Sequence, residues 1–490
     1  MKYLLGIDFG GGASKATLLC ENGEICATST CEYPTSYPKP GYVEQDPFDW
    51  VKATCENIKN ILWQSKIAPS DIAALSLDAA THTAVIMDEN FNVLRPSVYW
   101  TDTRSLAEVS FLKENYSQII EKQVLHKPDT IWTLPELMWI KNNEPEVWFK
   151  FKKILFAKDF VRHFFTGDYV TDYIEAEGSM MFDINTMNWS RELCGILGID
   201  IQMLPRIVKP TDISGTITQK AADITGLCEG TPVLCGTTDT VMEVFASGAV
   251  EKGDMTVKLA TAGRICVVTD KPYPDINLIN YSHITDGLFY PGTATKSCAA
   301  SMRWFRDTFG GGYAEFDEMS INIPIGSDGL VFHPYLNGEL TPYANPKLCG
   351  DFTGIRAFHT KAHFARAVME GVAMSMTDCK NTLESLSVPH KECAVIIGGG
   401  AKSKVWRQMI ADSLGIKLVE MKYADSSFGS AMLAGVAAGI FESPARALQI
   451  CNRVVSETLP DMENNKKYQK LFARYKAIQK ALEPIYNEEW

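Results

Sequence analysis

The N-terminal segment DFGGGASK contains residue types suited to holding a phosphate group and a metal ion. Asp8 ends an apolar run, and Gly10, Gly11 and Gly12 follow it closely. Glycines let backbone N–H groups approach phosphate oxygens, and a carboxylate at a strand end can hold Mg²⁺, usually through water. Lys15 could meet a phosphate or lie solvated at a strand end. A plain hairpin turn would use the same glycines, and the segment matches neither a P-loop nor a dinucleotide fingerprint.

A second segment, PVLCGTTDTVMEVFASG, places a carboxylate where it could take a proton from a hydroxyl group. An apolar run ends in small residues, and Asp239 begins a stretch with helical periodicity. A carboxylate there could act as a general base, while the helix N-terminus would favour a nearby anionic phosphoryl group. Asp239 could equally be only the N-cap of that helix, because Asp caps helices well. These residues alone leave both interpretations open.

A third segment, IIGGGAKSKVWRQMIADSLG, has an apolar strand that runs into three glycines and then into a long helical stretch. Such a connection lets a ligand approach the backbone. It is not a Walker A loop, because that loop would need glycines where Ile396 and Ala401 stand. A tight strand-to-helix turn without a ligand would use the same residues.

The elements that must position these segments alternate between strand-like and helix-like stretches. The N-terminus is predicted to form two strands joined by the glycines, and Asn22-Gly23 is typical of a hairpin turn. Residues 46–64 have helical periodicity, with Asp46 as N-cap and Pro47 in the first turn. Strand, small-residue turn and strand recur in DMTVKLATAGRICVVTD. The alternation predicts an α/β fold, and the recurrence indicates a weak internal duplication that joins near residues 246–254.

The composition of the 490-residue chain is that of a globular protein, with 46% hydrophobic and 22% charged residues. The net charge of −12 gives no general attraction for nucleic acid or an anionic membrane. No apolar run is long enough for a membrane span or a signal-peptide core. The 13 scattered cysteines contain no Cys-x-x-Cys pair, so we expect reduced thiols in a cytoplasmic protein.

Four longer segments resemble the FGGY family of carbohydrate kinases. GDFTGIRAFHTKAHFARAVMEG fits the second signature of that family throughout its length, and Gly-Gly-Gly-Ala-x-Ser followed by Trp-Arg-Gln-Met fits its adenine-side pattern. FHPYLNGELTP resembles Pro-Tyr-Leu-x-Gly-Glu-Arg-Thr-Pro with Leu340 in place of Arg, and GYVEQDPFDWV contains the early Glu-Gln-Asp-Pro. With the segments above, the resemblance extends from residue 4 to residue 440.

The resemblance implies an α/β fold of two actin-like, ribonuclease-H-type domains with a central cleft for ATP and a sugar. The domains would be residues 1–247, on the sugar and Mg²⁺ side, and residues 248–490, on the nucleotide side. Asp239 would be the catalytic base, and Asp8 would coordinate Mg²⁺. The implied ATP-binding residues are Gly10, Gly11, Gly12, Lys15, Thr261, Gly263, Gly399, Gly400 and Ala401. The implied sugar-binding residues are Thr81, His82, Trp100, Asp102, Arg104, Asp239 and Thr240.

Several of these positions depart from the family pattern. Gly11 and Gly12 supply no hydroxyl, and the second phosphate loop is Ala-Thr-Ala-Gly where the family has Gly-Thr-Ser-Gly. Thr240 stands where Asn is common, Thr81 replaces Met and Thr101 replaces Asn. Backbone amides can still bind phosphate, so ATP use is still expected. At a site built on hydrogen bonds, however, each altered donor changes the discrimination between sugars.

We therefore expect an ATP- and Mg²⁺-dependent kinase that phosphorylates a sugar hydroxyl. The sugar-side positions resemble those of the xylulokinase members of the family, which favours a ketopentose such as D-xylulose and formation of the 5-phosphate. The alternatives are a kinase of another ketose or polyol, a degenerate sugar- or nucleotide-binding protein, and an actin- or chaperone-like ATPase. No nucleic-acid or membrane partner is expected, and association as a homodimer is left open.

Overall fold

The computed structural model describes residues 1–275 and 277–488, which form two compact units. The first unit contains Met1–Gly248, Tyr281–Asp286 and Tyr423–Arg453; the second contains the described residues of Ala249–Asn280, Gly287–Lys422 and Val454–Trp490. The sequence predicts a division into residues 1–247 and 248–490. In the structure, two segments of the predicted second domain, Tyr281–Asp286 and Tyr423–Arg453, belong to the first unit. The second of those segments contributes a helix that packs against the first unit's main sheet.

A mixed seven-stranded sheet is the centre of the first unit. Its order is β13-β14-β5-β1-β2-β3, and β15 also pairs with β5. The strands are β1 (Tyr3–Phe9), β2 (Ala13–Cys20), β3 (Ile25–Glu32), β5 (Ile72–Ala79), β13 (Ile213–Thr216), β14 (Pro232–Leu234) and β15 (Thr237–Thr238). β1 runs antiparallel to β2 and parallel to β5, and the predicted turn at Asn22-Gly23 is confirmed, with φ of 88° at Gly23.

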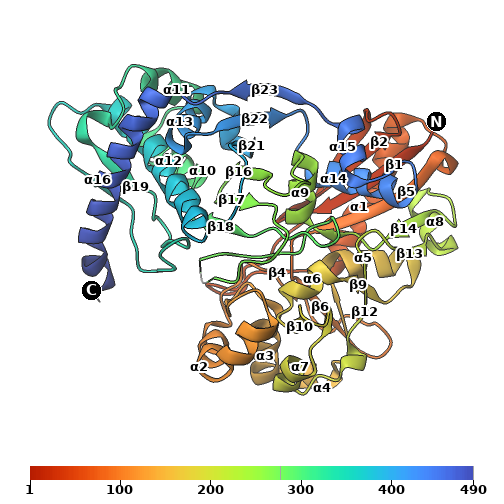
Figure 1. Cartoon of the computed structure of the whole chain (residues 1–490). Helices are drawn as coiled ribbons and strands as arrows, with labels where there is room; N and C mark the ends of the chain where they lie inside the picture. The colour runs from red at the N-terminus through yellow and green to blue at the C-terminus, as the bar shows by residue number, and fades with distance from the viewer. Residues whose placement is uncertain (276, 489–490) are drawn as a thin grey trace. The chain divides into compact units, whose positions relative to one another are not determined.

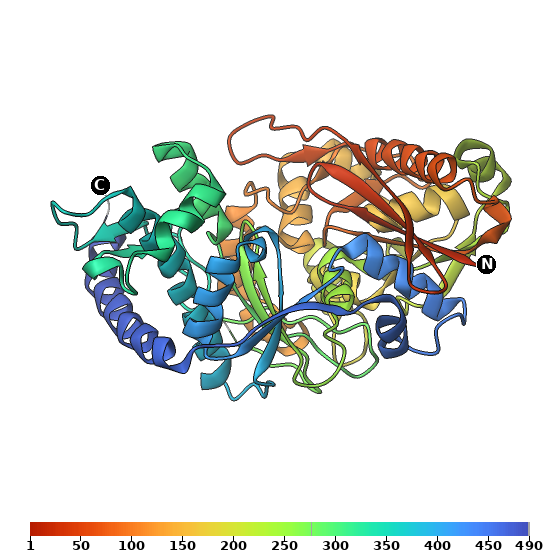
Figure 2. The ribbon, with the colours of Figure 1, turned by 90° about the horizontal axis from the view of Figure 1, so that it is seen from above.

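Helices far apart in the sequence cover the two faces of this sheet. Helix α1 (Pro47–Ser65) begins after the predicted N-cap Asp46, which accepts a hydrogen bond from the amide of Phe48. On the α1 face Asn57 donates to Ser14 of β2, and on the opposite face Thr17 of β2 contacts the hydroxyl of Ser427. Ser427 belongs to α14 (Ser426–Ala437), which lies beside β1 and β5 (Figures 1 and 2).

The close approach of α14 to β1 requires a glycine. A Cβ atom at Gly6 would lie 2.0 Å from the carbonyl oxygen of Ser427 and 2.3 Å from the amide nitrogen of Ala431. Both are backbone atoms of α14, so a side chain could be accommodated only if the helix moved away from the strand. The glycine in the apolar run YLLGIDF is therefore a packing requirement.

The other elements of the first unit form smaller layers around the main sheet. They are β4 (Glu44–Gln45), η1 (Pro69–Asp71), β6 (Ala84–Met87), β7 (Ser97–Val98), α2 (Leu106–Gln123), α3 (Thr133–Asn143), α4 (Pro145–Lys150), β8 (Lys153–Phe156), α5 (Ala157–Thr166), β9 (Val170–Asp172), α6 (Tyr173–Gly178), β10 (Phe182–Asp183), β11 (Asn188–Trp189), α7 (Arg191–Leu197), η2 (Ile201–Met203), β12 (Arg206–Val208), α8 (Gln219–Thr225), α9 (Asp239–Ser247) and α15 (Pro444–Cys451). Figure 1 labels most of them.

The second unit is built on a six-stranded sheet with the order β18-β17-β16-β21-β22-β23. The predicted strand–turn–strand pattern is present as the antiparallel pair β16 and β17, and β16 is parallel to β21. Its elements are β16 (Met255–Leu259), β17 (Gly263–Val267), β18 (Gly292–Thr295), α10 (Ala299–Phe309), α11 (Tyr313–Ile321), η3 (Ser327–Gly329), β19 (Val331–His333), β20 (Asp351–Thr353), α12 (Lys361–Ser385), β21 (Cys393–Ile397), η4 (Gly399–Lys402), α13 (Lys404–Leu414), β22 (Lys417–Met421), β23 (Val454–Thr458) and α16 (Met462–Asn487).

The cysteines behave as small core residues in most positions. All 13 have free thiols, and eight of them, including Cys20, Cys235 and Cys379, are buried. Within residues 1–275 and 277–488, no helix has the length and apolar character that a membrane crossing requires.

We predict that Gly6→Ala lowers the melting temperature of the protein, because the new methyl group meets the backbone of α14. Overpacking of this kind costs about 1–3 kcal/mol or more. The matched control is Gly195→Ala in α7, where a Cβ has no neighbour within 4 Å. Alanine in a helix interior is favoured over glycine by roughly 0.5–1 kcal/mol, so the control should not lose stability. Thermal melts of both variants test this, and equal melting temperatures would contradict the packing argument.

Candidate active site

Two carboxylates meet at the carboxyl ends of the parallel strands β1 and β5. Asp8 and Asp78 are register partners, and each has one buried carboxylate oxygen, Oδ1, without a hydrogen-bond partner. The other oxygen of Asp78 accepts a hydrogen bond from Ser430 of α14. Burial raises the pKa of Asp8 to about 7, and the negative charges of Asp239 and Asp425 add to this shift. The burial of these groups and the neighbouring carboxylates therefore disfavour the ionised form of Asp8.

Asp78 is a site residue that the sequence interpretation missed. It lies in the run IAALSLDAA, whose apolar composition predicts a strand and gives no indication of a site. Burial and the neighbouring Asp8 raise its pKa well above the ordinary range. The available signal was its place near the end of an apolar run, because carboxyl ends of parallel strands meet at one edge of a sheet. The pairing of β1 with β5, which brings Asp78 to Asp8, cannot be read from either run alone.

The glycine turn after Asp8 leaves backbone amides available. The carbonyl of Gly10 accepts a hydrogen bond from the Tyr33 hydroxyl at 2.5 Å, and the carbonyl of Gly11 accepts one from Gln45 at 2.9 Å. Within the described residues, the amides of Gly11 and Gly12 have no protein acceptor. A Cβ at Gly12 would face open space. Two N–H groups are thus left for an anion.

Lys15 makes a contact that the sequence did not suggest. Its ammonium lies 2.7 Å from a carboxylate oxygen of Asp425, and both side chains are about one-third exposed. Asp425 also caps α14 by accepting from the amide of Ser427. Lys15 is therefore tied to the N-terminus of α14, and any phosphate contact would have to share its charge with Asp425.

Asp239 is the first residue of α9, so the N-cap interpretation is wrong in detail. The N-cap is Thr238, whose side chain makes no capping hydrogen bond. One oxygen of Asp239 accepts from the amide of Thr240 at 2.5 Å, and the Thr240 hydroxyl lies 3.3 Å from the same oxygen. The charge of Asp239 contributes to the raised pKa values of both Asp8 and Asp78. The three carboxylates therefore form one group.

His82 is held rigidly on the sugar side. Its backbone has φ of 71°, its N–H donates to Glu175 at 2.7 Å, and its carbonyl accepts from Thr133 at 2.9 Å. The ring is 2% exposed, packs against Trp132 with centroids 4.7 Å apart, and lies 3.3 Å from the hydroxyl of Tyr281. Burial and the nearby His126 lower the pKa of His82 well below its usual value, so the ring is neutral at pH 7. Thr81 beside it is half-buried.

The segment WTDTR is fixed by a buried ion pair. Asp102 accepts a hydrogen bond from Arg104 at 2.8 Å and another from the amide of Val43 at 2.5 Å. Arg104 also lies 2.9 Å from Glu44 and stacks 4.0 Å above the ring of Tyr42, with its side chain 1% exposed. Trp100, in contrast, is 41% exposed. Asp102 and Arg104 thus hold the turn, and direct contact between them and a sugar stays a prediction.

The second unit gathers the candidate nucleotide residues around the end of β16. The carbonyl of Thr261 accepts from the amide of Cys298, directly before α10, at 2.9 Å. A Cβ at Gly263 would lie 2.8 Å from the sulfur of Met376, so packing explains that glycine. Gly400 likewise packs against Leu259, at 3.0 Å. A Cβ at Gly399 would meet nothing within 4 Å, which leaves its backbone open to a ligand.

Ala401, the last member of the predicted nucleotide set, is 4% exposed, and its amide donates to the carbonyl of Gly398. Gly398 has φ of 95°, and a Cβ there would lie 2.6 Å from the carbonyl oxygen of Leu259. Ala401 therefore packs beneath the surface of the glycine loop, and its backbone amide is already bonded to the carbonyl of Gly398.

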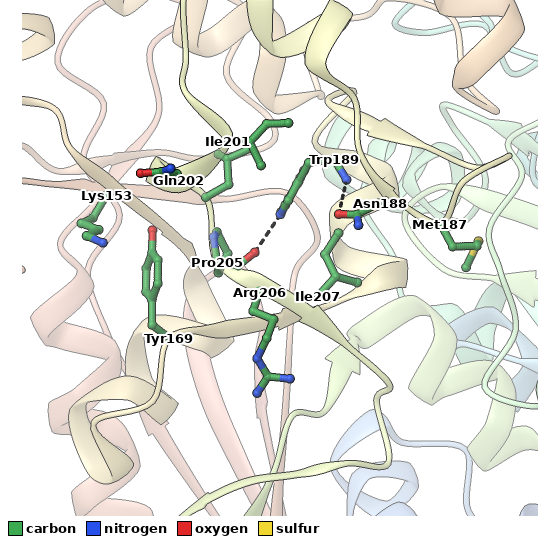
Figure 3. Close-up of a pocket in the computed structure, with 11 residues that line it drawn as sticks. Lys153, Tyr169, Met187, Asn188, Trp189, Ile201, Gln202, Pro205, Arg206 and Ile207 are labelled. Carbon is green, nitrogen blue, oxygen red and sulfur yellow. Dashed lines mark hydrogen bonds between the residues drawn. The ribbon is translucent and has the colours of Figure 1, made fainter.

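A hollow of about 410 Å³ lies elsewhere in the first unit (Figure 3). Its lining includes Lys153, Tyr169 and Arg206, and the indole N–H of Trp189 donates to the carbonyl of Pro205 there at 2.7 Å. No residue of the sequence-predicted site lines it, so it is separate from the carboxylate group of Asp8, Asp78 and Asp239.

Known proteins resemble the chain over its full length. Residues 3–246 match the N-terminal domain of the FGGY family of carbohydrate kinases, and residues 268–438 match its C-terminal domain. A xylulose kinase of Bacillus subtilis is 32% identical over 98% of this chain and 97% of its own length. A gluconokinase of the same organism is 29% identical, over 99% and 97%.

Solved structures agree with these sequence similarities. The ligand-bound xylulose kinase of Lactobacillus acidophilus has a TM-score of 0.94 and 27% identity, and it covers 99% of both chains. The xylulose kinase of Rhodospirillum rubrum has a TM-score of 0.92 and 25% identity, and it covers 99% of this chain and 100% of its own. These similarities confirm the predicted α/β fold of two actin-like domains and a carbohydrate kinase that uses ATP. The chain belongs to the FGGY family of carbohydrate kinases.

Proposed function

We propose that this carbohydrate kinase transfers the γ-phosphoryl group of ATP to a ketopentose, with D-xylulose as the favoured substrate and the 5-phosphate as product. Relatives named xylulose kinase, at 28–32% identity over nearly the whole chain, support this choice. The observation that carries the reaction type is the position of Asp239, at the first turn of α9 and within reach of the charges of Asp8 and Asp78.

In the proposed mechanism Asp239 orients the sugar hydroxyl and accepts its proton as the hydroxyl oxygen attacks the γ-phosphorus. The bond between the γ-phosphorus and the β,γ-bridging oxygen breaks in the same transfer, and ADP leaves. The amides of Gly11 and Gly12 and the N-terminal end of α9 supply positive electrostatic potential near the phosphate groups. In the second unit, Thr261, Gly263, Gly399, Gly400 and Ala401 would contact the nucleotide. Phosphoryl transfer leaves the protein mainly the tasks of positioning and charge stabilisation.

The carboxylate group fits a Mg²⁺ ion. Asp8 and Asp78 present two buried oxygens without hydrogen-bond partners, and oxygen donors are the ligands that Mg²⁺ prefers. Mg²⁺ in kinase sites is usually held by one or two carboxylates together with water and substrate phosphates. When bound, the ion would neutralise charge on the phosphate oxygens.

The buried charges favour a neutral sugar over gluconate. A carboxylate substrate would need a cation, and Arg104 is the cation among the predicted sugar-binding residues. Its guanidinium lies 2.8 Å from Asp102 and 2.9 Å from Glu44. His82 is neutral because its pKa is lowered by burial. Neither side chain therefore offers an unpaired positive charge to a sugar acid.

We predict that D-xylulose is phosphorylated with a higher kcat/KM than D-gluconate or glycerol. ADP release with Mg-ATP across a panel of ketoses, polyols and gluconate measures this, and the product position follows from NMR of the sugar phosphate. A higher kcat/KM for gluconate or glycerol would overturn the proposed substrate while leaving the carbohydrate kinase unaffected. ADP release that does not depend on any sugar would indicate an ATPase.

We predict that Asp239→Asn lowers kcat at least about 100-fold, because general-base assistance contributes ~10²–10⁴-fold, or about 3–5 kcal/mol of barrier. Asn keeps the size of the side chain and an oxygen for the Thr240 amide, so ATP binding and the melting temperature should stay near wild type. The matched control is Asp461→Asn at the N-cap of α16, which should keep normal kcat. An active Asp239→Asn enzyme would end the proposed mechanism.

We predict that Asp8→Asn weakens Mg²⁺-dependent turnover far more than it weakens folding, and that Asp8→Ala does the same. The pKa of Asp8 is raised to about 7, so its charge costs folding free energy that accumulates as the pH rises from about 4 to 7. At pH 8 the Asn variant should therefore melt at or above the wild-type temperature. Mn²⁺ binding in the presence of ADP, followed by electron paramagnetic resonance, should weaken. If these variants kept the turnover and the Mn²⁺ affinity of the wild type, Asp8 would not be part of the metal site.

A further inference from the structure

One buried carboxylate connects the loop that carries Asp239 with the loop that carries His82. Asp172 ends β9 and caps α6, accepting hydrogen bonds from the amides of Ile174 at 3.0 Å and Glu175 at 3.2 Å. The same oxygen, Oδ1, accepts from the hydroxyl of Thr237 at 2.8 Å. Asp172 and Thr237 are both fully buried.

The Thr237 contact fixes the approach to Asp239. Thr237 lies two residues before Asp239, in β15, and is the register partner of Asp78. The preceding Gly236 has φ of 70°, and a Cβ there would lie 1.9 Å from the carbonyl oxygen of Leu77. The backbone before Asp239 therefore packs closely against β5 at Gly236, and the hydroxyl of Thr237 links it to Asp172.

The other end of α6 fixes His82. Glu175, whose amide is capped by Asp172, accepts the backbone N–H of His82 at 2.7 Å. At the last residue of the same helix, a Cβ on Gly178 would lie 1.5 Å from the imidazole ring of His82. A six-residue helix thus contacts the backbone of His82 with its first turn and the ring with its last residue.

A buried ionic network holds Asp172 in place. The ammonium of Lys158 lies 2.8 Å from Asp172 and 2.5 Å from Asp159, and all three residues are fully buried. Arg162 pairs with Asp159 and also donates to the carbonyl of Cys235 at 2.7 Å. The network of Lys158, Asp159, Arg162 and Asp172 therefore holds the 235–239 segment at two points, a carbonyl and a hydroxyl. Buried ion pairs of this kind are weak evidence for stability, because apolar replacements are often as stable.

We propose that Asp172 is a positioning residue that sets the placement of the base Asp239 relative to the sugar-side residue His82, through the Thr237 hydroxyl on one side and helix α6 on the other. This inference rests on the proposed function, in which Asp239 is the base. Asp172 itself touches no reacting group. Misplacement of a base by about 1 Å can cost roughly 10²-fold in rate, and it lets water compete with the sugar hydroxyl for the phosphoryl group.

The test uses Thr237→Val, because Asp172→Ala would uncap α6, leave Lys158 short of a partner and risk misfolding. Valine keeps the shape of threonine and has a methyl group in place of the hydroxyl, so the hydrogen bond to Asp172 is lost. The control is Thr225→Val in α8, which removes a buried hydroxyl that donates to the carbonyl of Ala221 and accepts from the amide of Leu227. The rescue variant is Thr237→Ser, which retains the hydroxyl. The measurements are kcat, the KM values for sugar and ATP, the melting temperature, and the moles of sugar phosphate formed per mole of ADP released.

We expect Thr237→Val to lose at least about 10-fold in kcat, with KM for ATP unchanged and with less than one sugar phosphate formed per ADP. Its melting temperature should fall no further than that of Thr225→Val, which should keep the wild-type kcat and product ratio. Thr237→Ser should recover most of the activity. A purely structural role would lower both melting temperatures and leave the product ratio unchanged, and that result would overturn the proposal.

The same experiment separates this inference from the proposed function. If Asp239→Asn is inactive while Thr237→Val has wild-type kcat and product ratio, the base assignment stands and the positioning role of Asp172 is wrong. If Asp239→Asn is fully active, the base assignment fails and the positioning proposal fails with it. Loss of activity in Thr225→Val equal to that in Thr237→Val would also overturn the proposal, because the effect would then follow from any buried hydroxyl.

Discussion

The parallel pairing of β1 with β5 places Asp8 opposite Asp78, and the proposed active site depends on this pair of buried carboxyl groups. Burial raises the pKa of both carboxyl groups, and the charge of Asp8 raises the pKa of Asp78 further. Isolated charges are not retained in a buried position without compensation. In the proposed function, a Mg²⁺ ion would compensate the charge of the carboxylates, and the amides of Gly11 and Gly12 would bind the phosphate groups.

The first unit depends on a segment that follows most of the second unit in the sequence. Helix α14 supplies Ser430 to Asp78, Ser427 to Thr17 and, through its N-cap Asp425, a partner for Lys15. It can do so only because Gly6 has no side chain. The candidate site is therefore assembled from the N-terminal strands and from residues about 350–410 positions later, and it does not exist in either segment alone.

The polar groups of the proposed site in the first unit are of two kinds: some have no protein partner among the described residues and are available to a ligand, and others are already paired with protein groups. The amides of Gly11 and Gly12 and the oxygens Oδ1 of Asp8 and Asp78 belong to the first kind. The pair of Asp102 with Arg104 belongs to the second, as does the ionic network around Asp172. Residues of the second kind restrict the conformations of the loops that carry the first kind. The distances to protein partners therefore distinguish a group that is available to a ligand from a group that only holds a loop in place.

The sequence by itself determined the α/β class, the strand and turn at Asp8, the helix capped by Asp46 and the family, because these follow from local periodicity, turn residues and long motifs. It also drew attention to Asp8, His82 and Asp239. The tertiary structure decided the rest. Asp78 and Asp172 each lie near the end of a strand, and that position alone does not distinguish a site carboxylate from an ordinary cap or surface residue. The sequence suggests that Arg104 could offer a positive charge to a ligand, whereas in the fold its guanidinium is paired with Asp102 and Glu44. Asp102 is only two residues from Arg104, but Glu44, the second partner of Arg104, and the partners Ser430 of Asp78 and Thr237 of Asp172 lie tens to hundreds of positions away. No local pattern encodes which distant strand or helix contacts a given side chain.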